Sequence, residues 1–151
     1  MKKILIINGP NLNMLGVRSP ELYGKKDLAS VISWTEKKLE KEKLKIKLEW
    51  FQSNSEGEIV NKIQSILSEK NKIGLIINPA GFSHTSVAIL DSLEILETSN
   101  IPIIEVHITN LFKREGLRQT LLTAKGATAI ISGLGPSTYF IAIKSLLMEK
   151  E

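Results

Sequence analysis

The sequence predicts an α/β fold in which one parallel sheet is covered by helices on both faces. Five short strand-like runs alternate with segments whose apolar residues recur at helical spacing. The first run is short and apolar, as in a buried strand, whereas the second alternates apolar and charged residues, as in a strand at a sheet edge. A length of 151 residues fits one domain of ordinary size.

The first half of the chain contains two predicted strands and two predicted helices. Residues 2–7 form the buried strand, and residues 44–50 form the strand with one face in water. Between them Asp27 caps a helix, which has its apolar positions at Leu28, Val31, Ile32, Thr35 and Leu39. Ser55 and Glu58 form a capping box for the next helix, which continues through Ile59, Ile63, Ile66 and Leu67.

The second half contains three predicted strands, at residues 73–77, 102–106 and 127–131. One helix lies between the first two of them and presents Val87, Leu90, Leu93 and Leu96. Ser137 is expected to cap the last helix, through Phe140, Ile143 and Leu147. The half-exposed second strand favours the order 2-1-3-4-5, a flavodoxin-like three-layer sandwich. We therefore expect a single domain over residues 1–151.

Composition excludes several classes of function. The chain has no cysteine, which excludes disulfides, thiolate metal sites and cysteine nucleophiles and fits a cytoplasmic location. No apolar run approaches the ~18 residues needed to span a membrane. The net charge is +4, but the lysines of residues 37–47 are interleaved with glutamates and only 5% of residues are aromatic. We expect neither a nucleic-acid nor a membrane partner.

Two long connections carry most of the chemically useful side chains. Residues 8–26 and 109–126 follow strand ends and exceed the ~2–6 residues usual for such connections. The candidate residues at or after the ends of the first, third and fourth strands are Asn8, Asn11, Asn13, Arg18, Tyr23, Asn78, Gly81, His84, Glu105, His107, Thr109, Arg114 and Arg118. Because open α/β sheets bind ligands at the carboxyl ends of their strands, we expect a pocket with a lid.

Single members of this set have simpler interpretations. Asn11 suits a turn, Tyr23 a surface loop, and His84 a helix cap. Glu105 is harder to explain, because a carboxylate in the middle of a buried strand is costly unless it is paired. The convergence of all these groups at one edge of the sheet favours a functional site.

The common cofactor motifs are absent or incomplete. Gly133-Leu134-Gly135 lacks the third glycine of a dinucleotide site and follows the last strand, and there is no Walker lysine motif. His84 and His107 could share a metal with Glu105 or Asp91, but no local metal motif supports this. We expect no cofactor and no metal. Arginine, asparagine, histidine and tyrosine suit a small, hydroxylated, anionic substrate.

In this order, the residues resemble the type II 3-dehydroquinate dehydratases (type II dehydroquinases). The resemblance runs from about Ile4 to Leu146. It rests on the runs Ile7-Asn8-Gly9-Pro10-Asn11-Leu12-Asn13-Met14-Leu15-Gly16, Arg18, Tyr23-Gly24, Gln52-Ser53-Asn54-Ser55-Glu56-Gly57, Asn78-Pro79-Ala80-Gly81, His84-Thr85-Ser86-Val87-Ala88, Asp91, Glu105-Val106-His107-Ile108-Thr109-Asn110, Arg114-Glu115, Arg118, Gly133-Leu134-Gly135 and Tyr139. Thr109 stands where serine is usual, Ala80-Gly81 varies a pair of small residues, and Gly116-Leu117 replaces a bulkier pair.

The resemblance implies a hydro-lyase of the shikimate pathway, and so of aromatic amino acid biosynthesis. It converts 3-dehydroquinate to 3-dehydroshikimate by anti elimination of water through an enolate. It implies that Tyr23 is the base, favoured as tyrosinate by Arg18. His107 is the acid, oriented by Glu105, and Asn11 positions a water facing the enolate.

The resemblance also implies how substrate is held and how the chain assembles. Substrate contacts fall to Asn78, His84, Arg118 and the backbone of Ile108 and Thr109. Asp91 reaches the site of a neighbouring subunit, and trimers assemble into dodecamers. Two other classes of function remain open: a module that binds a flavin or nucleotide, and a scaffolding subunit without catalysis.

Overall fold

The computed structural model describes residues 1–148 and contains one five-stranded parallel sheet. The strand order is β2-β1-β3-β4-β5, which confirms the predicted order and fold class. The strands are β1 (Lys3–Asn8), β2 (Lys47–Gln52), β3 (Lys72–Asn78), β4 (Ile103–His107) and β5 (Ala129–Ser132). The end of the predicted domain, residues 149–151, lies outside the described residues.

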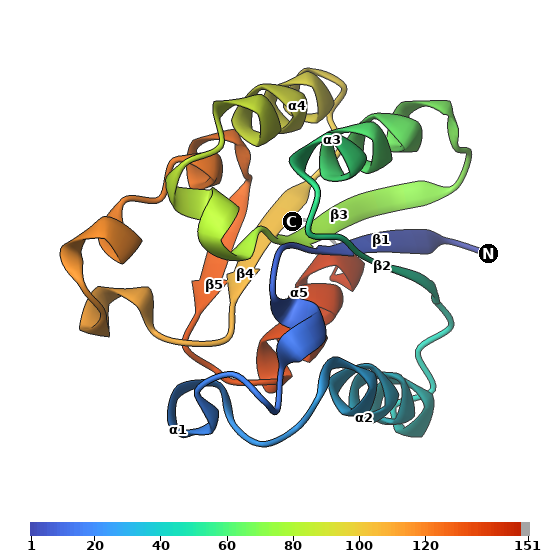
Figure 1. The fold of residues 1–151 in the computed structure, drawn as a ribbon. Coiled ribbons are helices and arrows are strands. Elements are labelled where there is room, and N and C mark those ends of the chain that lie inside the picture. The colour runs from blue at the N-terminus through green and yellow to red at the C-terminus, as the bar shows by residue number, and fades with distance from the viewer. Residues whose placement is uncertain (149–151) are drawn as a thin grey trace.

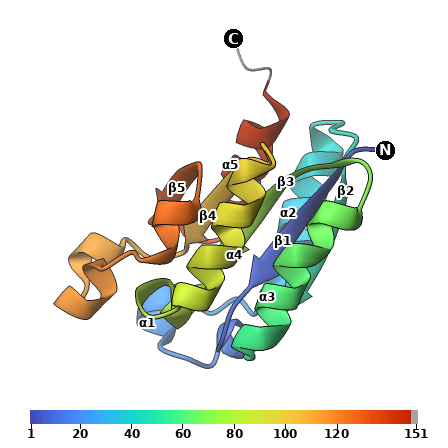
Figure 2. The ribbon, with the colours of Figure 1, turned by 90° about the horizontal axis from the view of Figure 1, so that it is seen from above.

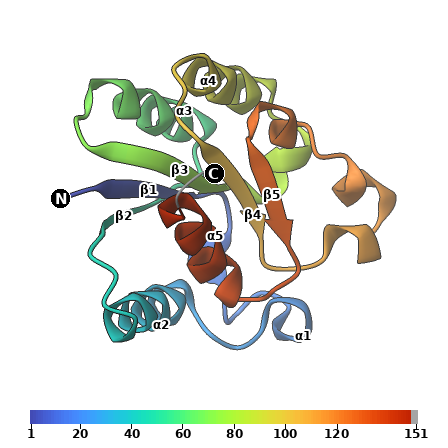
Figure 3. The same cartoon turned by 180° about the vertical axis from the view of Figure 1, so that it is seen from behind.

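Helices cover both faces of this sheet, in three layers (Figure 1). The helices are α1 (Pro20–Tyr23), α2 (Leu28–Lys41), α3 (Glu56–Ser65), α4 (Val87–Thr98) and α5 (Ser137–Leu147). In Figure 1, α3 and α4 lie above the sheet and α2 and α5 below it, and Figure 3 shows the same layers from behind. The short α1 lies at the opposite end of the sheet from the N-terminus (Figure 2).

The strands alternate their side chains between two apolar layers. Ile4, Ile6 and Ile76 pack with α2 and α5, while Leu5 and Ile77 pack with α3 and α4. All five of these side chains are fully buried. The central strands are therefore apolar on both faces, as strands between two helical layers must be.

The second strand begins later than its alternating pattern predicts. Its ladder with β1 pairs Lys3 with Lys47 and Asn8 with Gln52, so residues 44–46 lie outside the strand. Lys43 adopts a left-handed conformation (φ 56°), and the chain after it still has to cross to the sheet edge. Leu44 and Ile46 nevertheless pack against the core, which explains why they continue the apolar alternation.

Several other boundaries and caps differ from the prediction. Ser137 does not cap α5: it is the first helical residue, and its hydroxyl donates to the Leu134 carbonyl (2.6 Å). Strand β5 begins two residues later than predicted. Val87 and Leu67 are about half exposed rather than buried. Asp27 and Ser55 cap their helices as predicted, because each accepts a hydrogen bond from the backbone N–H three residues on. The capping box itself is incomplete, since the Ser55 N–H donates to Ser53 Oγ and the Glu58 carboxylate accepts from the Ser53 hydroxyl.

The two long connections contain more local structure than their sequence pattern indicates. The first contains α1 and a 3₁₀ turn, and the second contains three 3₁₀ turns: η4 (Leu111–Lys113), η5 (Gly116–Gln119) and η6 (Thr123–Gly126). A further 3₁₀ segment, η3 (Ala80–His84), follows β3. Among residues 1–148, no helix has the length and apolar character needed to cross a membrane.

Candidate active site

The carboxyl ends of β1, β3 and β4 place their polar side chains around one pocket. Asn8 and Asn78 are register partners on adjacent strands, and β4 ends at His107. This pocket is partly open to solvent. It is lined by Leu12, Arg18, Tyr23, Asn78, Ala80, Gly81, His84, His107, Ile108, Thr109, Leu111, Arg114 and Arg118.

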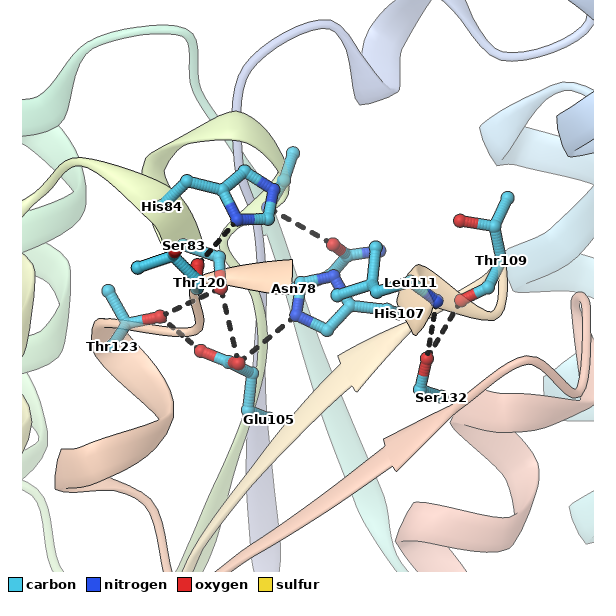
Figure 4. A network of polar contacts seen from close by, with 11 residues as sticks. Asn78, Ser83, His84, Glu105, His107, Thr109, Leu111, Thr120, Thr123 and Ser132 are labelled. Carbon is cyan, nitrogen blue, oxygen red and sulfur yellow. Dashed lines mark hydrogen bonds and ion pairs between the residues drawn. The ribbon is translucent and has the colours of Figure 1, made fainter. Parts of the chain in front are cut away.

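His107 is backed by the buried carboxylate of Glu105 (Figure 4). Its Nε2 lies 3.1 Å from Glu105 Oε2. Because a carboxylate accepts, Nε2 carries the proton of this hydrogen bond, which leaves Nδ1 for a ligand in the pocket. Glu105 also accepts hydrogen bonds from the hydroxyls of Thr123 and Ser83. The partners that a mid-strand carboxylate requires are therefore present.

Tyr23 lies between two guanidinium groups at the end of α1. Arg114 Nη1 donates to the Tyr23 hydroxyl at 2.5 Å, and the Arg114 side chain is only 12% exposed. Arg18 lies over the ring of Tyr23, with its Cζ 5.0 Å from the ring centroid. The hydroxyl is thus held by Arg114, while Arg18 contributes its charge from the ring face.

Asn78 is oriented from below by a fully buried tyrosine. Asn78 Nδ2 donates to the Tyr139 hydroxyl (3.0 Å), and Tyr139 donates in turn to Asn8 Oδ1 (2.5 Å). Burial raises the pKa of Tyr139 well above its usual range, so this hydroxyl stays protonated and donates. Asn78 Oδ1 accepts from the backbone N–H of Ala80 (3.2 Å), which fixes the amide orientation at the pocket floor.

His84 and Arg118 are each held by the loop that follows β4. His84 Nδ1 contacts the Thr120 carbonyl at 2.8 Å, so Nδ1 carries a proton and Nε2 remains for the pocket. His84 therefore does not cap a helix, which was the simpler interpretation of this residue, and Ser86 caps α4 instead. Arg118 Nε donates to Glu115 Oε1 at 2.5 Å.

Ile108 and Thr109 continue directly from β4 along the pocket wall. Ile108 is buried and its carbonyl accepts from Gly135 N–H (3.0 Å). The Thr109 carbonyl accepts from the Ser132 hydroxyl (2.8 Å). Both backbone segments are therefore tied to β5 and the turn after it, which gives the wall a fixed position.

Three predicted site residues do not line this pocket. Asn11 is exposed in a left-handed turn (φ 66°), where its backbone N–H donates to Asn54 Oδ1 (3.0 Å). Asp91 is exposed on α4. Glu105 also has no surface in the pocket, but it acts on the pocket through its hydrogen bond to His107.

Four residues that contact the site have no role that the sequence alone assigns. Arg114 is the closest cation to the Tyr23 hydroxyl, Thr123 and Ser83 bind Glu105, and Tyr139 binds Asn78. Arg114 could have been singled out from the sequence, because it is a charged residue in a long loop after a strand end. A threonine, a serine and a tyrosine among apolar neighbours offer no comparable signal.

The chemistry of the pocket is that of a cationic site with one acid–base pair of side chains. Arg18, Arg114 and Arg118 supply positive charge for an anionic ligand. Tyr23 and His107 offer a hydroxyl and an imidazole that can exchange protons. Among residues 1–148, no group of three or more histidine, aspartate or glutamate side chains could hold a metal ion.

Comparison with known proteins relates nearly the whole chain to one family. The model of the family described as dehydroquinase class II matches residues 2–147. A 3-dehydroquinate dehydratase of Clostridium botulinum is 45% identical over 147 residues, which cover 97% of this chain and 95% of that protein. One of Aliarcobacter butzleri is 43% identical over 145 residues, which cover 96% and 84%. The crystal structure of a type II dehydroquinase from Butyrivibrio crossotus matches with a TM-score of 0.89 and 37% identity, over 97% and 98% of the two chains.

Proposed function

The chain belongs to the class II dehydroquinases, and on that premise we propose that it eliminates water from 3-dehydroquinate in the anti sense, through an enolate, to give 3-dehydroshikimate. It is a hydro-lyase, and its family implies a place in the shikimate pathway. One observation carries the mechanistic part. A tyrosine held by a guanidinium and a histidine backed by a carboxylate open onto the same cationic pocket.

Tyr23 is the base in this proposal. As tyrosinate it takes a proton from carbon 2 of the substrate, beside the ketone, and the electron pair moves onto the ketone oxygen to form the enolate. The guanidinium of Arg114, 2.5 Å from the hydroxyl, stabilises the tyrosinate oxygen directly. Arg18 adds a second positive charge beside the ring, which favours the same anion.

His107 is the acid. When the enolate returns to the ketone, the carbon 1–carbon 2 double bond forms and the bond from carbon 1 to its hydroxyl breaks. Nδ1 of His107 gives its proton to the departing hydroxyl, which leaves as water, while Nε2 stays bonded to Glu105. Tyr23 ends protonated and His107 neutral, so one proton returns from tyrosine to histidine through solvent before the next turnover.

Other residues of the pocket hold the substrate. Arg118 and the backbone N–H groups of Ile108 and Thr109 take the carboxylate, and Asn78 and His84 take the hydroxyls. Asn11 lies outside the pocket lining, and its role is to hold a water that faces the enolate oxygen. Asp91 acts in the site of a neighbouring subunit, which agrees with its exposure on α4.

The proposal is tested by mixing the purified protein with 3-dehydroquinate and following the conjugated-enone absorbance of the product. Tyr23→Phe and Arg18→Ala are measured alongside, with EDTA present and after borohydride treatment. We expect turnover that survives both treatments and is lost in both variants. A well-folded wild-type protein without turnover would refute the dehydratase proposal and favour a binding module, which would retain a flavin or nucleotide after purification.

A further inference from the structure

Four polar side chains from three segments meet beneath the pocket, away from solvent (Figure 4). Glu105 and His107 belong to β4, Ser83 to η3 and Thr123 to η6. Glu105, Ser83 and Thr123 are 0% exposed and His107 is 4% exposed. A carboxylate at this depth is unfavourable unless donors surround it, so its hydroxyl partners influence its charge as well as its position.

All the polar contacts of the Glu105 side chain among residues 1–148 come from groups that can donate. The Thr123 hydroxyl donates to Oε1, and Oε2 accepts from the Ser83 hydroxyl (3.3 Å) and from His107 Nε2 (3.1 Å). The two hydroxyl oxygens lie 3.3 Å apart. Each hydroxyl and the ring N–H of His107 has one proton to donate. All three groups can donate to Glu105 only when its carboxylate is not protonated.

Among residues 1–148, the side chains that line the pocket with His107 include no carboxylate, and Glu115, which pairs with Arg118, lies outside the lining. The neighbours of Glu105 across the ladders, Ile77 and Ile130, are apolar. The titratable groups that share the pocket with His107 come from the loop after β1, from η3 and from the loop after β4, and they are Arg18, Tyr23, His84, Arg114 and Arg118. Three of them are permanent cations, and their positive charge opposes the protonation of the His107 ring to an imidazolium.

A proton on His107 Nδ1 therefore depends on the anion behind Nε2. Since Nε2 already carries a proton toward Glu105, Nδ1 can donate only when the ring is an imidazolium. We infer that the hydroxyls of Thr123 and Ser83 are positioning groups, which keep Glu105 ionised and aligned so that His107 stays charged and acts as the acid. This inference rests on the proposed function, because it concerns the proton donor of that reaction.

The experiment compares Thr123→Val, which keeps the shape and removes the hydroxyl, with Thr123→Ser, which keeps the hydroxyl. We expect Thr123→Val to lower kcat about tenfold with little change in KM, as for one lost hydrogen bond to a buried charge. The basic limb of its kcat–pH profile moves to lower pH by about one unit, because a weaker anion behind Nε2 holds the proton of the imidazolium less tightly. Thr123→Ser restores both. Ser83→Ala changes both in the same direction by less, because its contact is longer.

A purely structural role makes a different prediction. Thr123→Val and Thr123→Ser would then show the same kcat, or Thr123→Val would keep the wild-type pH profile, and either result would overturn the inference. Thermal unfolding shows whether Thr123→Val folds. If it does not, the same comparison is made between Ser83→Ala, which lacks the hydroxyl, and Ser83→Thr, which keeps it.

A second readout separates this inference from the proposed function. The chain has two histidines, so the NMR titration of the His107 ring is identified by comparison with His84→Gln. We expect the His107 midpoint in Thr123→Val to be displaced from the wild-type value and that in Thr123→Ser to coincide with it. Failure of the wild type to turn over 3-dehydroquinate would refute the function alone, whereas coinciding midpoints in all three proteins would refute the role of Thr123.

Discussion

At the scale of single residues, the partner of Tyr23 is what the structure adds to the sequence. The motifs indicate Arg18 as the cation that favours the tyrosinate, whereas Arg114 makes the direct hydrogen bond. Arg114 is 91 residues from Tyr23 along the chain. The pairing depends on how two long loops fold over the sheet edge, which residue spacing does not encode.

Replacing Arg114 tests this assignment. Arg114→Gln removes the charge at the tyrosine oxygen, and we expect kcat to fall about 10²–10³-fold, as when a donor to a developing anion is lost. Lys113→Gln, in the adjacent exposed position, removes the same charge without removing a hydrogen bond to Tyr23, and should leave kcat within twofold. Steady-state kinetics of the two variants provide the measurement. Similar kcat values for Arg114→Gln and Lys113→Gln would contradict a direct role for Arg114.

The candidate site residues could be named from the sequence to a large extent. Long loops after strand ends and a carboxylate in mid-strand pointed to Arg18, Tyr23, His84, Glu105 and His107, and all of these except Glu105 line the pocket. The hydroxyls of Thr123 and Ser83 could not be assigned to the site from the sequence. What sets them apart from other threonines and serines is their contact with the Glu105 carboxylate, which only the structure shows.

At the scale of elements, the ends of β1 and β3 are held together by a close backbone approach. Gly9 N–H donates to the Asn78 carbonyl at 2.8 Å, and a Cβ at Gly9 would lie 2.5 Å from the Pro79 carbonyl oxygen. The contact is with backbone rather than with a flexible side chain. Only glycine allows the two strands to bring Asn8 and Asn78 side by side under the pocket.

Gly9→Ala should therefore damage both stability and the site. We expect it to lower the free energy of unfolding by about 1–3 kcal/mol, as overpacking does, and to reduce turnover. Gly57→Ala is the matched control, since its Cβ would meet only Ser55 Oγ at 3.9 Å, in the first turn of α3. Urea unfolding monitors both variants. Equal stabilities of Gly9→Ala and Gly57→Ala would refute the close-approach explanation.

Strand β2 is held at the sheet edge partly by a buried lysine and its carboxylate. Glu49 Oε1 and Oε2 each accept from a lysine at 2.5 Å, from Lys62 and Lys72 respectively, and the Lys72 side chain is 1% exposed. The hydrogen bonds from Lys62 and Lys72 lower the pKa of Glu49 to about 2. Since its unfolded pKa is near 4.5, the stabilisation is present above that pH and is lost as pH falls toward 2.

A pH series of unfolding measurements tests this contribution. We expect Glu49→Gln to be less stable than wild type by about 1–2 kcal/mol at pH 7, after allowance for solvent screening, and the difference to vanish by about pH 2. Glu97→Gln, at an exposed position of α4, controls for the loss of a surface charge. A difference that stayed constant from pH 7 to pH 2 would contradict the ionic explanation.

The elements themselves were predictable because apolar periodicity reports burial directly. All five strands and the four long helices lie where the pattern indicates, with ends displaced by a few residues. The start of β2 was predicted wrongly, because Leu44 and Ile46 pack on the core without joining the ladder. Helix α1 was not predicted, since its four residues PELY are too few to display a period.

At the scale of the whole molecule, several large apolar side chains are left exposed on α4, β5 and α5. Val87 (57%), Ile95 (45%), Ile130 (41%) and Ile141 (42%) belong to this set. Strand β5 is also an edge of the sheet with no paired neighbour on its outer side among residues 1–148. Because the family resemblance implies assembly, we propose that copies of the chain contact one another through some of these exposed apolar groups.

Subunit mixing tests both the assembly and the proposed role of Asp91. We expect light scattering to give a mass that is a multiple of one chain, and Asp91→Asn to keep that mass while losing activity. If Asp91 acts in a neighbour's site, exchange of subunits between inactive Asp91→Asn and inactive Tyr23→Phe assemblies restores part of the activity, because some sites then receive both intact residues. A monomeric active enzyme, or no recovery on proven exchange, would contradict this.

The central claim, a tyrosine-based anti elimination, is tested most directly with 3-dehydroquinate that carries deuterium at carbon 2 in the position anti to the departing hydroxyl. Mass spectrometry of the 3-dehydroshikimate formed shows which hydrogen has left. We predict product without deuterium, and a primary isotope effect on the step that Tyr23 performs. Product that retains the deuterium would contradict anti elimination by this chain.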